Sequence, residues 1–454
     1  MNISRVATIL AMGAVLASTF LTISVSAESK VRIVRLSDVE GTVQIDRNTG
    51  DGFEKAFLNL PVIEGSHLKT GKDGRAEVEF EDGSALRVGP DSEVQFTKLA
   101  LGDDGQKLST VELVSGTAYA SLRPKKGDEI LLNFAQESLT VPQFAHFRVV
   151  MTGSAHATVA VFKGAVSASG PSGKFDVAEK HSANIDLASG DAAKSDGDKT
   201  DNAKKDAFVI AKNYEQDPLD GWDRQQNDYH ERYANAGSSS FSSPYGYGVS
   251  DLNYYGNFMM LPGYGSVWQP FFTDANWSPF MDGAWAWYPG AGYTWVSAYP
   301  WGWMPYRYGN WEFVPGYGWV WAPGMWNSWY AVPQLRNPPP RTKIATAPVS
   351  GRKTVMVGMG LTTNPVGTPR KVTINPGSAG FGVPRGSVRH LDHVARTVEH
   401  TSAPVTTSTQ PPPQPSNSGW GNGGFGGNPP MRGGSSTTST TGAHHTSAPP
   451  SRPH

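Results

Sequence analysis

Residues 75–88 read RAEVEFEDGSALRV, and this stretch decides the fold of the first half of the chain. Apolar and polar residues alternate over 76–80 and again over 85–88, as in strands that bury one face. Asp82-Gly83 lies between the two runs, and this pair favours a tight hairpin turn because Gly tolerates a positive φ. Similar short runs, separated by turn residues, continue on both sides and predict an antiparallel β-domain over residues 30–186.

The same stretch also carries a family resemblance. Together with the LP, EG and LKTG elements of residues 60–71, it resembles the FecR domain, which is named after the iron-dicitrate transport regulator. The resemblance implies a periplasmic β-domain that binds other proteins and has no catalytic residues. A FecR-type regulator places a cytoplasmic segment before its membrane helix, whereas only Met1–Arg5 precede the apolar run here. We therefore expect extracytoplasmic binding or a structural role rather than control of a sigma factor.

Composition and charge narrow the class of protein. The chain has 454 residues and a formal net charge of −1, but residues 334–454 hold 12 basic and only two acidic side chains. The preceding residues therefore carry a net charge of −11. Gly and Pro together make up 85 residues, which is above the average share and disfavours one compact α/β enzyme domain. The chain has no Cys, so disulfides, thiolate zinc sites and cysteine nucleophiles are excluded.

The first residues have the pattern of a secretory signal peptide. Arg5 supplies the positive charge, residues 6–25 are apolar or small, and Val25-Ser26-Ala27 has small residues at the two positions that define a cleavage site. We predict a signal peptide over residues 1–27 that is cleaved after Ala27, with an uncleaved membrane anchor as the alternative. A periplasmic or secreted location follows, and we expect no transmembrane span in the mature chain.

Two segments follow the predicted β-domain. Residues 187–206 are rich in Asp, Lys, Ala, Gly and Ser and predict a linker. In residues 207–236 aromatic and apolar residues recur at helical spacings, which predicts a short helical hinge with its helix over Leu219–Ala236. Charged residues of this helix, among them Asp223 and His230, are expected on a solvated face rather than in a catalytic cluster.

Residues 251–333 contain 12 of the 14 tryptophans and three copies of one repeat. The copies begin at Gly256, Gly283 and Gly309, and each has Pro-Gly-x-Gly six residues later and a Trp after twelve. Pro-Gly favours a tight turn, so each copy predicts a strand, a turn and a return strand. Three such hairpins bury a shared core that one would lack, which predicts a small aromatic β-hairpin repeat domain.

The tryptophans of the repeat allow two interpretations. They form the core of the small domain, or they form an exposed platform for sugar rings or a protein partner. The candidate residues are Trp268, Trp285, Trp295, Trp311 and Trp321. We expect Trp268, Trp295 and Trp321 to be the structural set, since they occupy equivalent places in the three hairpins. Trp285 and Trp311, on the opposite strands, serve as the comparison.

Residues 334–454 are rich in Pro, Gly, Ser and Thr and are expected to be mostly disordered, with short strands near 353–375. Their net charge of +10 suits contact with anionic envelope polymers, but the basic residues are too dispersed for specific nucleic-acid recognition. His390, Asp392 and His393 suggest a metal site, yet their spacing matches no well-defined one. We assign no metal, cofactor or catalytic residue.

These observations predict a mainly β, non-catalytic exported envelope protein. Its FecR-like domain would bind a protein or a ligand, and the chain would serve as a signalling or structural adaptor. The alternative is a protein that binds glycans or the cell wall through the aromatic repeat, and less readily one that acts on glycans. The expected partner is therefore an envelope protein or a glycan.

Overall fold

The computed structural model defines most of the chain between residues 32 and 410. It describes residues 32–188, 207–234, 245–326, 334–340, 342, 345–361, 364, 366–367 and 369–410. The predicted signal peptide with Ala27, most of the predicted linker and the tail beyond residue 410 lie outside these ranges. Contacts divide the chain into two units, Met1–Gln414 and Pro415–His454, and all described residues belong to the first.

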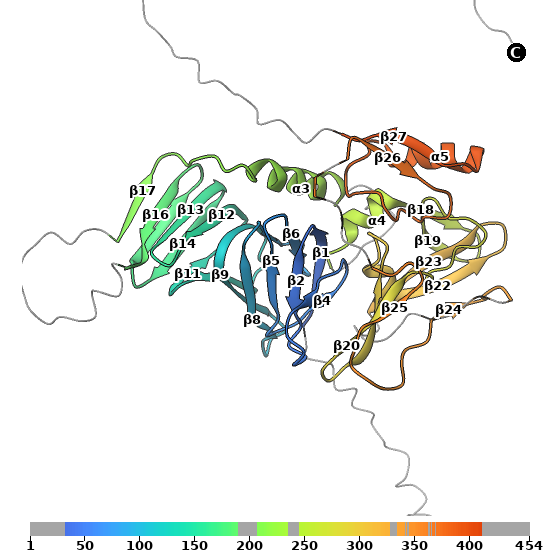
Figure 1. Cartoon of the computed structure of the whole chain (residues 1–454), viewed down its shortest axis with the longest axis horizontal. Helices are drawn as coiled ribbons and strands as arrows, with labels where there is room; N and C mark the ends of the chain where they lie inside the picture. Colours follow the sequence, from blue (N-terminus) through green and yellow to red (C-terminus); the bar gives the residue numbers. More distant parts are fainter. Residues whose placement is uncertain are drawn as a thin grey trace, which may run out of the picture. The chain divides into compact units, whose positions relative to one another are not determined.

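The first part of the chain forms a β-domain of seventeen strands, here called the N-terminal β-domain (Figure 1). The hairpin of residues 75–88 is present, because β6 and β7 pair antiparallel and Gly83 has a φ of 86° in the turn. The strands are β1 (Val34–Glu40), β2 (Val43–Asp46), β3 (Glu54–Lys55), β4 (Pro61–Val62), β5 (His67–Thr70), β6 (Arg75–Glu79), β7 (Ala85–Val88), β8 (Glu93–Leu101), β9 (Lys107–Leu122), β10 (Glu129–Phe134), β11 (Glu137–Thr140), β12 (Ala145–Thr152), β13 (His156–Lys163), β14 (Ala165–Gly170), β15 (Gly173–Ala178), β16 (Ser182–Asp186) and β17 (Phe208–Ala211). The predicted mainly β fold is confirmed.

The long strand β9 belongs to both sheets of this domain. Its first half pairs with β8 and β10, and its second half pairs with β7 and β12. The change of sheet occurs at Gly116, which has a φ of 85°. A Cβ at this position would lie 2.2 Å from the hydroxyl oxygen of Ser92, so only glycine fits. The two sheets therefore enclose a common core with β9 as their shared strand.

The segment predicted as a helical hinge is partly a strand. Phe208–Ala211 forms β17, which pairs antiparallel with β16. The Phe208 ring stacks on Phe175 at a centroid distance of 4.1 Å, so tertiary packing overrides the helical spacing of the apolar residues. The helix itself, α3, spans Asp220–Tyr233, inside the predicted range. Figure 1 shows α3 running from the N-terminal β-domain toward the next part of the chain.

Each of the three repeats forms a hairpin. The three hairpins and the helix that precedes them are here called the aromatic region. Gly263, Gly290 and Gly316 have φ values of 82°, 74° and 84° in the three Pro-Gly turns, as the turn chemistry predicts. The first and third hairpins share one sheet, in the order β18-β19-β23-β22-β24, whereas the second hairpin lies in another sheet, in the order β21-β20-β25. The elements are α4 (Val249–Tyr255), β18 (Gly256–Leu261), β19 (Gly265–Pro270), β20 (Gly283–Tyr288), β21 (Gly292–Ser297), η1 (Met304–Tyr306), β22 (Tyr308–Val314), β23 (Gly318–Trp326) and β24 (Leu335–Arg336).

The C-terminal part is more ordered than its composition predicts. Strands β25 (Val355–Val357) and β26 (Lys371–Ile374) lie where short strands are expected, and β25 adds to the second hairpin through β20. Helix α5 (Leu391–Thr401) and strand β27 (Val405–Ser408) are not predicted. Helix α5 forms because it has an apolar side, whose members Leu391, Ala395 and Val398 are buried, and β27 pairs antiparallel with β26. Residues 369–410 therefore contain a helix and a strand in addition to the short strands expected near 353–375.

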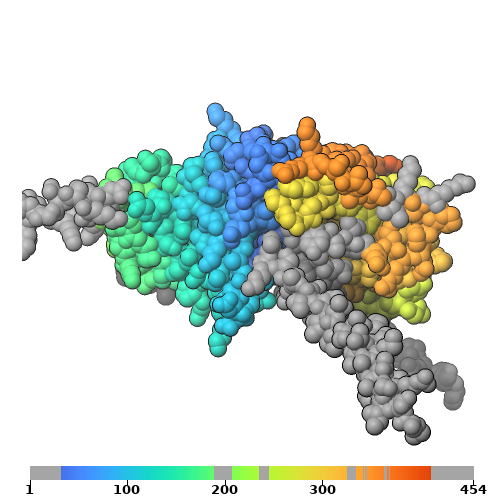
Figure 2. All heavy atoms as spheres, turned by 90° about the horizontal axis from the view of Figure 1, so that it is seen from below, coloured from blue at the N-terminus to red at the C-terminus, as the bar shows by residue number. Residues whose placement is uncertain are grey.

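One large hydrophobic core extends from the N-terminal β-domain into the aromatic region and residues 372–398. Polar contacts cross the same boundary. The Tyr288 hydroxyl donates to the Pro61 carbonyl oxygen at 2.7 Å, and the Asn59 side-chain amide donates to the Tyr299 carbonyl oxygen at 2.8 Å. Figure 2 shows the blue surface of the first strands directly beside the yellow and orange surface of the later residues. The two parts therefore pack as one body.

Candidate functional site

Charged side chains are buried together where β1, β6 and β7 meet α3, α4 and the segment after β26. Each of these side chains is at most 6% exposed. The members of this buried ion network are Arg35, Glu77, Glu79, Arg87, Asp223, Asp251 and Arg385. Buried charges are costly unless they are paired, so the geometry of each pair matters.

Glu77 lies at the centre of the network. One carboxylate oxygen accepts a hydrogen bond from Arg87 Nε at 2.8 Å, within the β6–β7 hairpin. The other contacts His230 Nε2 at 2.9 Å and Arg385 Nη1 at 2.5 Å. Burial alone would raise the pKa of Glu77, but the neighbouring His230, Arg385 and Arg87 hold it well below its usual value. Glu77 is therefore a charged carboxylate shared by three elements.

Helix α3 contributes Asp223 and His230 to the network. Asp223 accepts a hydrogen bond from Arg87 Nη1 at 2.8 Å and contacts His146 Nε2 of β12 at 2.7 Å. Burial opposes its ionisation, yet Arg87 and His146 lower the pKa of Asp223. The expectation of a solvated helix face is therefore wrong for Asp223 and His230, because the face that carries them packs onto β6, β7 and β12.

Arg385 joins the C-terminal segment to the network. Its Nε donates to Asp251 of α4 at 3.1 Å, and its Nη2 donates to the Ser37 carbonyl oxygen of β1 at 2.7 Å. Asp251 also pairs with Arg35 of β1 at 2.5 Å. Burial disfavours the charge of Asp251, but Arg385 and Arg35 lower its pKa. One guanidinium thus holds three parts of the sequence together.

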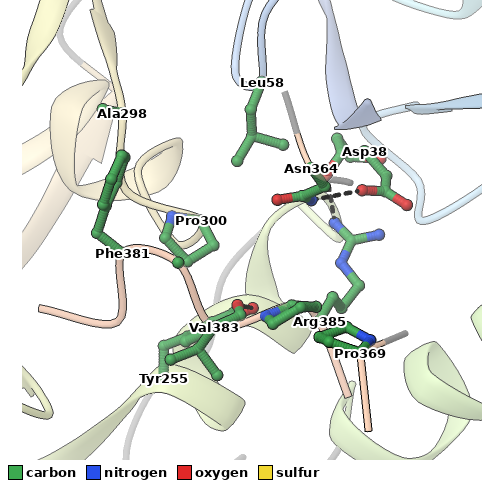
Figure 3. A pocket seen from close by; sticks show the side chains of 13 residues that line it. Asp38, Leu58, Tyr255, Ala298, Pro300, Asn364, Pro369, Phe381, Val383 and Arg385 are labelled. Atoms are coloured by element: carbon green, nitrogen blue, oxygen red, sulfur yellow. Dashed lines mark hydrogen bonds between the residues drawn. The ribbon is translucent and has the colours of Figure 1, made fainter. Parts of the chain in front are cut away.

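A cavity of about 130 Å³ adjoins this network (Figure 3). Figure 3 shows Asp38, Asn364 and Arg385 on one side of the cavity and Pro300 and Phe381 on the opposite side. The lining residues come from the N-terminal β-domain, the aromatic region and the C-terminal segment. They are Ser37, Asp38, Leu58, Tyr255, Ala298, Pro300, Asn364, Pro369, Phe381, Gly382, Val383, Pro384 and Arg385. The cavity therefore exists only when these segments are packed together.

Asp38 is the acidic residue of the cavity wall, and it is only 4% exposed. One of its oxygens accepts hydrogen bonds from the Val39 amide at 3.0 Å and from Asn364 Nδ2 at 3.2 Å. The other accepts a hydrogen bond from Gln226 Nε2 at 3.2 Å. Among the described residues, no cation lies within ion-pair distance of Asp38. Burial raises the pKa of Asp38 to about 7, with Glu40 adding to the rise and Arg385 opposing it.

We expect Asp38→Asn to stabilise the protein at pH 8 by about 2 kcal/mol and to have little effect at pH 4. Between its unfolded pKa near 4 and its folded pKa of about 7, Asp38 binds a proton in the folded state that the unfolded state lacks. The free energy of unfolding therefore falls as the pH rises through this range, by about 1.4 kcal/mol for each unit of pKa difference. Asn does not titrate, so the variant avoids this loss of unfolding free energy. Asn also forms fewer of the hydrogen bonds that Asp38 accepts, which reduces the net stabilisation to about 2 kcal/mol.

Urea denaturation at several pH values between 4 and 8 measures this effect. The difference between the two proteins should grow up to about pH 7 and then stay constant. Asp392→Asn, which changes an exposed aspartate, is the control and should leave the pH profile as it is. A difference that stays the same from pH 4 to pH 8 would show that Asp38 titrates normally.

All five candidate tryptophans are buried in the aromatic region. Trp268, Trp295 and Trp321 are at most 1% exposed, and Trp285 and Trp311 at most 3%. Trp285 lies directly opposite Trp295 in its hairpin, and Trp311 lies opposite Trp321. The two sets therefore do not separate into core and surface, because both strands of each hairpin direct these rings into the core.

His390, Asp392 and His393 lie together on the surface at the start of α5. Their ligand atoms are within 4.8 Å of one another, and all three residues are exposed. Asp392 already pairs with Arg396 Nη2 at 3.2 Å one turn along the helix. This arrangement favours a surface ion pair, and we assign no metal to it.

Neither the buried ion network nor the cavity was predicted from the sequence. One local signal was available, because Glu77 and Arg87 face each other across the 75–88 hairpin and carry opposite charges. Such pairs also occur on solvated sheet faces, so this signal does not reveal burial. The other partners lie far away in sequence; Arg35 and Asp251, for example, are 216 residues apart.

Comparison with known proteins gives matches for two parts of the chain. Residues 66–167 match the family described as FecR protein, and residues 249–350 match a family of unknown function, DUF6600. No curated protein matches the chain. Among the described residues, no helix has the length and apolar character needed to cross a membrane.

Two similar solved structures come from Parabacteroides distasonis, and both are of a protein proposed to be an anti-sigma factor. They are 13% and 14% identical to this chain, with a TM-score of 0.27 in each case. The matched part covers 34% of this chain and 63% of that protein's chain. The family matches, together with the hairpin of residues 75–88 and the three aromatic hairpins, show that the chain contains a FecR domain followed by a separate DUF6600 region.

Proposed function

We propose that the chain is a non-catalytic adaptor of the cell envelope that binds an envelope protein. The observation that carries this proposal is the FecR match over residues 66–167, since resemblance to that family implies a β-domain that binds other proteins. We propose further that the part of the molecule that binds the partner includes the aromatic region. A core and an ion network common to both parts support this addition.

The chemistry of the buried charges supports a structural role for them. Glu77, Asp223 and Asp251 are held by arginines and histidines, which lower their pKa values and favour the ionised form that a structural ion pair needs. Their pairs connect β6 and β7 with α3 and α4. An adaptor needs such a rigid body, because a preformed surface loses little entropy on binding.

Export of the chain is part of the proposal. The pattern of residues 1–27, with cleavage after Ala27, supports a periplasmic or secreted location. The absence of cysteines agrees with any compartment, because the fold has a large hydrophobic core and needs no disulfide. The five tryptophans proposed for a platform are buried, so they do not support the glycan alternative.

Capture of the partner in the envelope tests this function. The full chain with a C-terminal tag is expressed in its native host, cross-linked in intact cells and purified from the envelope fraction. We expect one envelope protein to be enriched, and the same pair to be recovered when that protein carries the tag instead. A chain without residues 1–27 is the control and should capture nothing from the envelope. Retention of the chain on isolated cell-wall glycan, with no protein captured, would contradict the proposal.

A further inference from the structure

The buried acids around the cavity are unequally paired. Five buried acids, Asp38, Glu77, Glu79, Asp223 and Asp251, lie in or beside the network, and three arginines, Arg35, Arg87 and Arg385, face them. His146 contacts Asp223, and His230 contacts Glu77 and Glu79. None of the ion pairs among the described residues includes Asp38. The acid that lines the cavity is therefore the one left without a cation.

Asp38 has room for one more donor. An ionised carboxylate offers about four acceptor positions, and three of them are used by Val39, Asn364 and Gln226. All three of these donors are neutral amides. A charged donor bonds to a buried carboxylate more strongly than a neutral one and would also relieve its desolvation.

The rest of the cavity is suited to an aliphatic group. Leu58, Ala298, Pro300, Phe381 and Val383 supply apolar wall. The volume of about 130 Å³ is close to that of an engineered cavity of ~150 Å³ that holds benzene, so a molecule of about six non-hydrogen atoms fits. Methylene groups pack on such a wall while a charged head group reaches a polar partner.

We propose that this cavity binds a primary ammonium group on a short aliphatic chain, with Asp38 as the acceptor of the ammonium protons. The chain lies between Leu58, Pro300 and Phe381. An anionic ligand is disfavoured because every nitrogen of Arg385 is already bonded, to Glu77, Asp251 or the Ser37 carbonyl oxygen. The chemistry is shared by two sources, a small free amine and the lysine side chain of another protein.

Calorimetric titration of the purified full-length chain tests the site. The probes are n-butylammonium and its neutral analogue n-butanol at pH 8. We expect n-butylammonium to bind at least tenfold more tightly, since only the cation pairs with Asp38. Equal binding of the two probes would show that the cavity selects shape alone and would overturn the proposal.

The pH dependence of binding gives a second readout. Asp38 must be ionised to hold the cation, and its pKa of about 7 predicts about tenfold weaker binding of n-butylammonium at pH 6 than at pH 8. The charged groups that face Asp38 are Glu40, Glu77 and Arg385, and Arg75 and His230 pair with the two glutamates. A change in the protonation of these neighbours could also make binding depend on pH. The pH dependence is therefore assigned to Asp38 only if Asp38→Asn removes it.

Variants separate the site from the rest of the fold. Asp38→Asn should bind n-butylammonium and n-butanol equally, whereas Asp392→Asn, an exposed change, should keep the tenfold preference. Phe381→Ala should weaken both probes alike, since it removes wall but no charge. A preference for the cation that survives in Asp38→Asn would refute the role of that residue. These outcomes do not depend on capture of an envelope protein, so the two proposals fail separately.

The two sources are distinguished by a third probe. Nα-acetyl-lysine amide carries the same ammonium chain on a peptide backbone. Binding comparable to that of n-butylammonium would identify a lysine side chain as a ligand that fits. Binding of n-butylammonium alone would assign the site to small free amines, because the cavity then does not accept an ammonium chain that is attached to a peptide backbone.

Discussion

Replacing Arg385 with Ala is expected to lower the free energy of unfolding by about 3–5 kcal/mol. The guanidinium is buried and bonds Glu77, Asp251 and the Ser37 carbonyl oxygen. Its removal leaves two buried carboxylates with one cation fewer, and a buried charge that loses its partner costs far more than the pair contributes. Urea denaturation at pH 7.5 measures the change, with Trp fluorescence as the signal.

The loss should be largest in the C-terminal segment, because Arg385 lies between β26 and α5 and ties this segment to β1 and β6. Hydrogen exchange of residues 369–410 should therefore increase more than that of β9. Arg396→Ala is the matched control, since Arg396 forms an exposed pair with Asp392 and should contribute less than about 0.5 kcal/mol. An Arg385→Ala protein as stable as the Arg396→Ala protein would mean that the network does not hold the segment in place.

The fold could be predicted where a short stretch of sequence carries its own turn chemistry. The 75–88 hairpin has Asp-Gly at its turn, and the aromatic hairpins have Pro-Gly, so local φ preferences and alternation point to the same structure. In β17 the local sequence pattern and the tertiary packing favour different structures. Phe208–Ala211 follows a helical spacing with the residues after it, but its contact with Phe175 and its pairing with β16 decide the outcome.

The candidate site could not be predicted, because it depends on contacts between distant segments. Glu77, Glu79 and Arg87 occupy the polar positions of an alternating hairpin, which normally face water. Here α3, α4 and the C-terminal segment cover that face, so polar alternation becomes a buried network. The cavity has the same origin, since its wall joins Asp38 with Asn364 and Phe381, which lie more than three hundred residues later in the sequence.

The composition of the C-terminal part does not predict its helix α5. The stretch from Leu391 to Thr401 has no Pro or Gly and carries apolar residues at helical spacing, so its local pattern is that of an amphipathic helix. The surrounding Pro, Ser and Thr lower the helix propensity when it is averaged over the whole region. A window of about eleven residues identifies this helix, whereas the composition of residues 334–454 does not.

Trp268→Ala is expected to destabilise the aromatic region by about 3–5 kcal/mol. The ring is fully buried, its Nε1 donates to the Leu252 carbonyl oxygen at 2.9 Å, and it contacts Trp301 edge-on at a centroid distance of 4.9 Å. Trp268 is also the residue through which β19 pairs with Trp321 of β23. The substitution therefore removes a core ring at the point where the first and third hairpins pair.

The control and the comparison come from the same sheet. Met260→Ala, at a residue 73% exposed on β18, should change stability by less than about 0.5 kcal/mol. Trp311→Ala should cost about as much as Trp268→Ala, because both rings pack against Trp301 in the core, although the repeat places them on different strands. Thermal unfolding followed by near-UV circular dichroism reports on this aromatic packing. If Trp268→Ala and Trp311→Ala unfold at the temperature of Met260→Ala, the rings do not form a core, and an exposed platform becomes the better interpretation of the repeat.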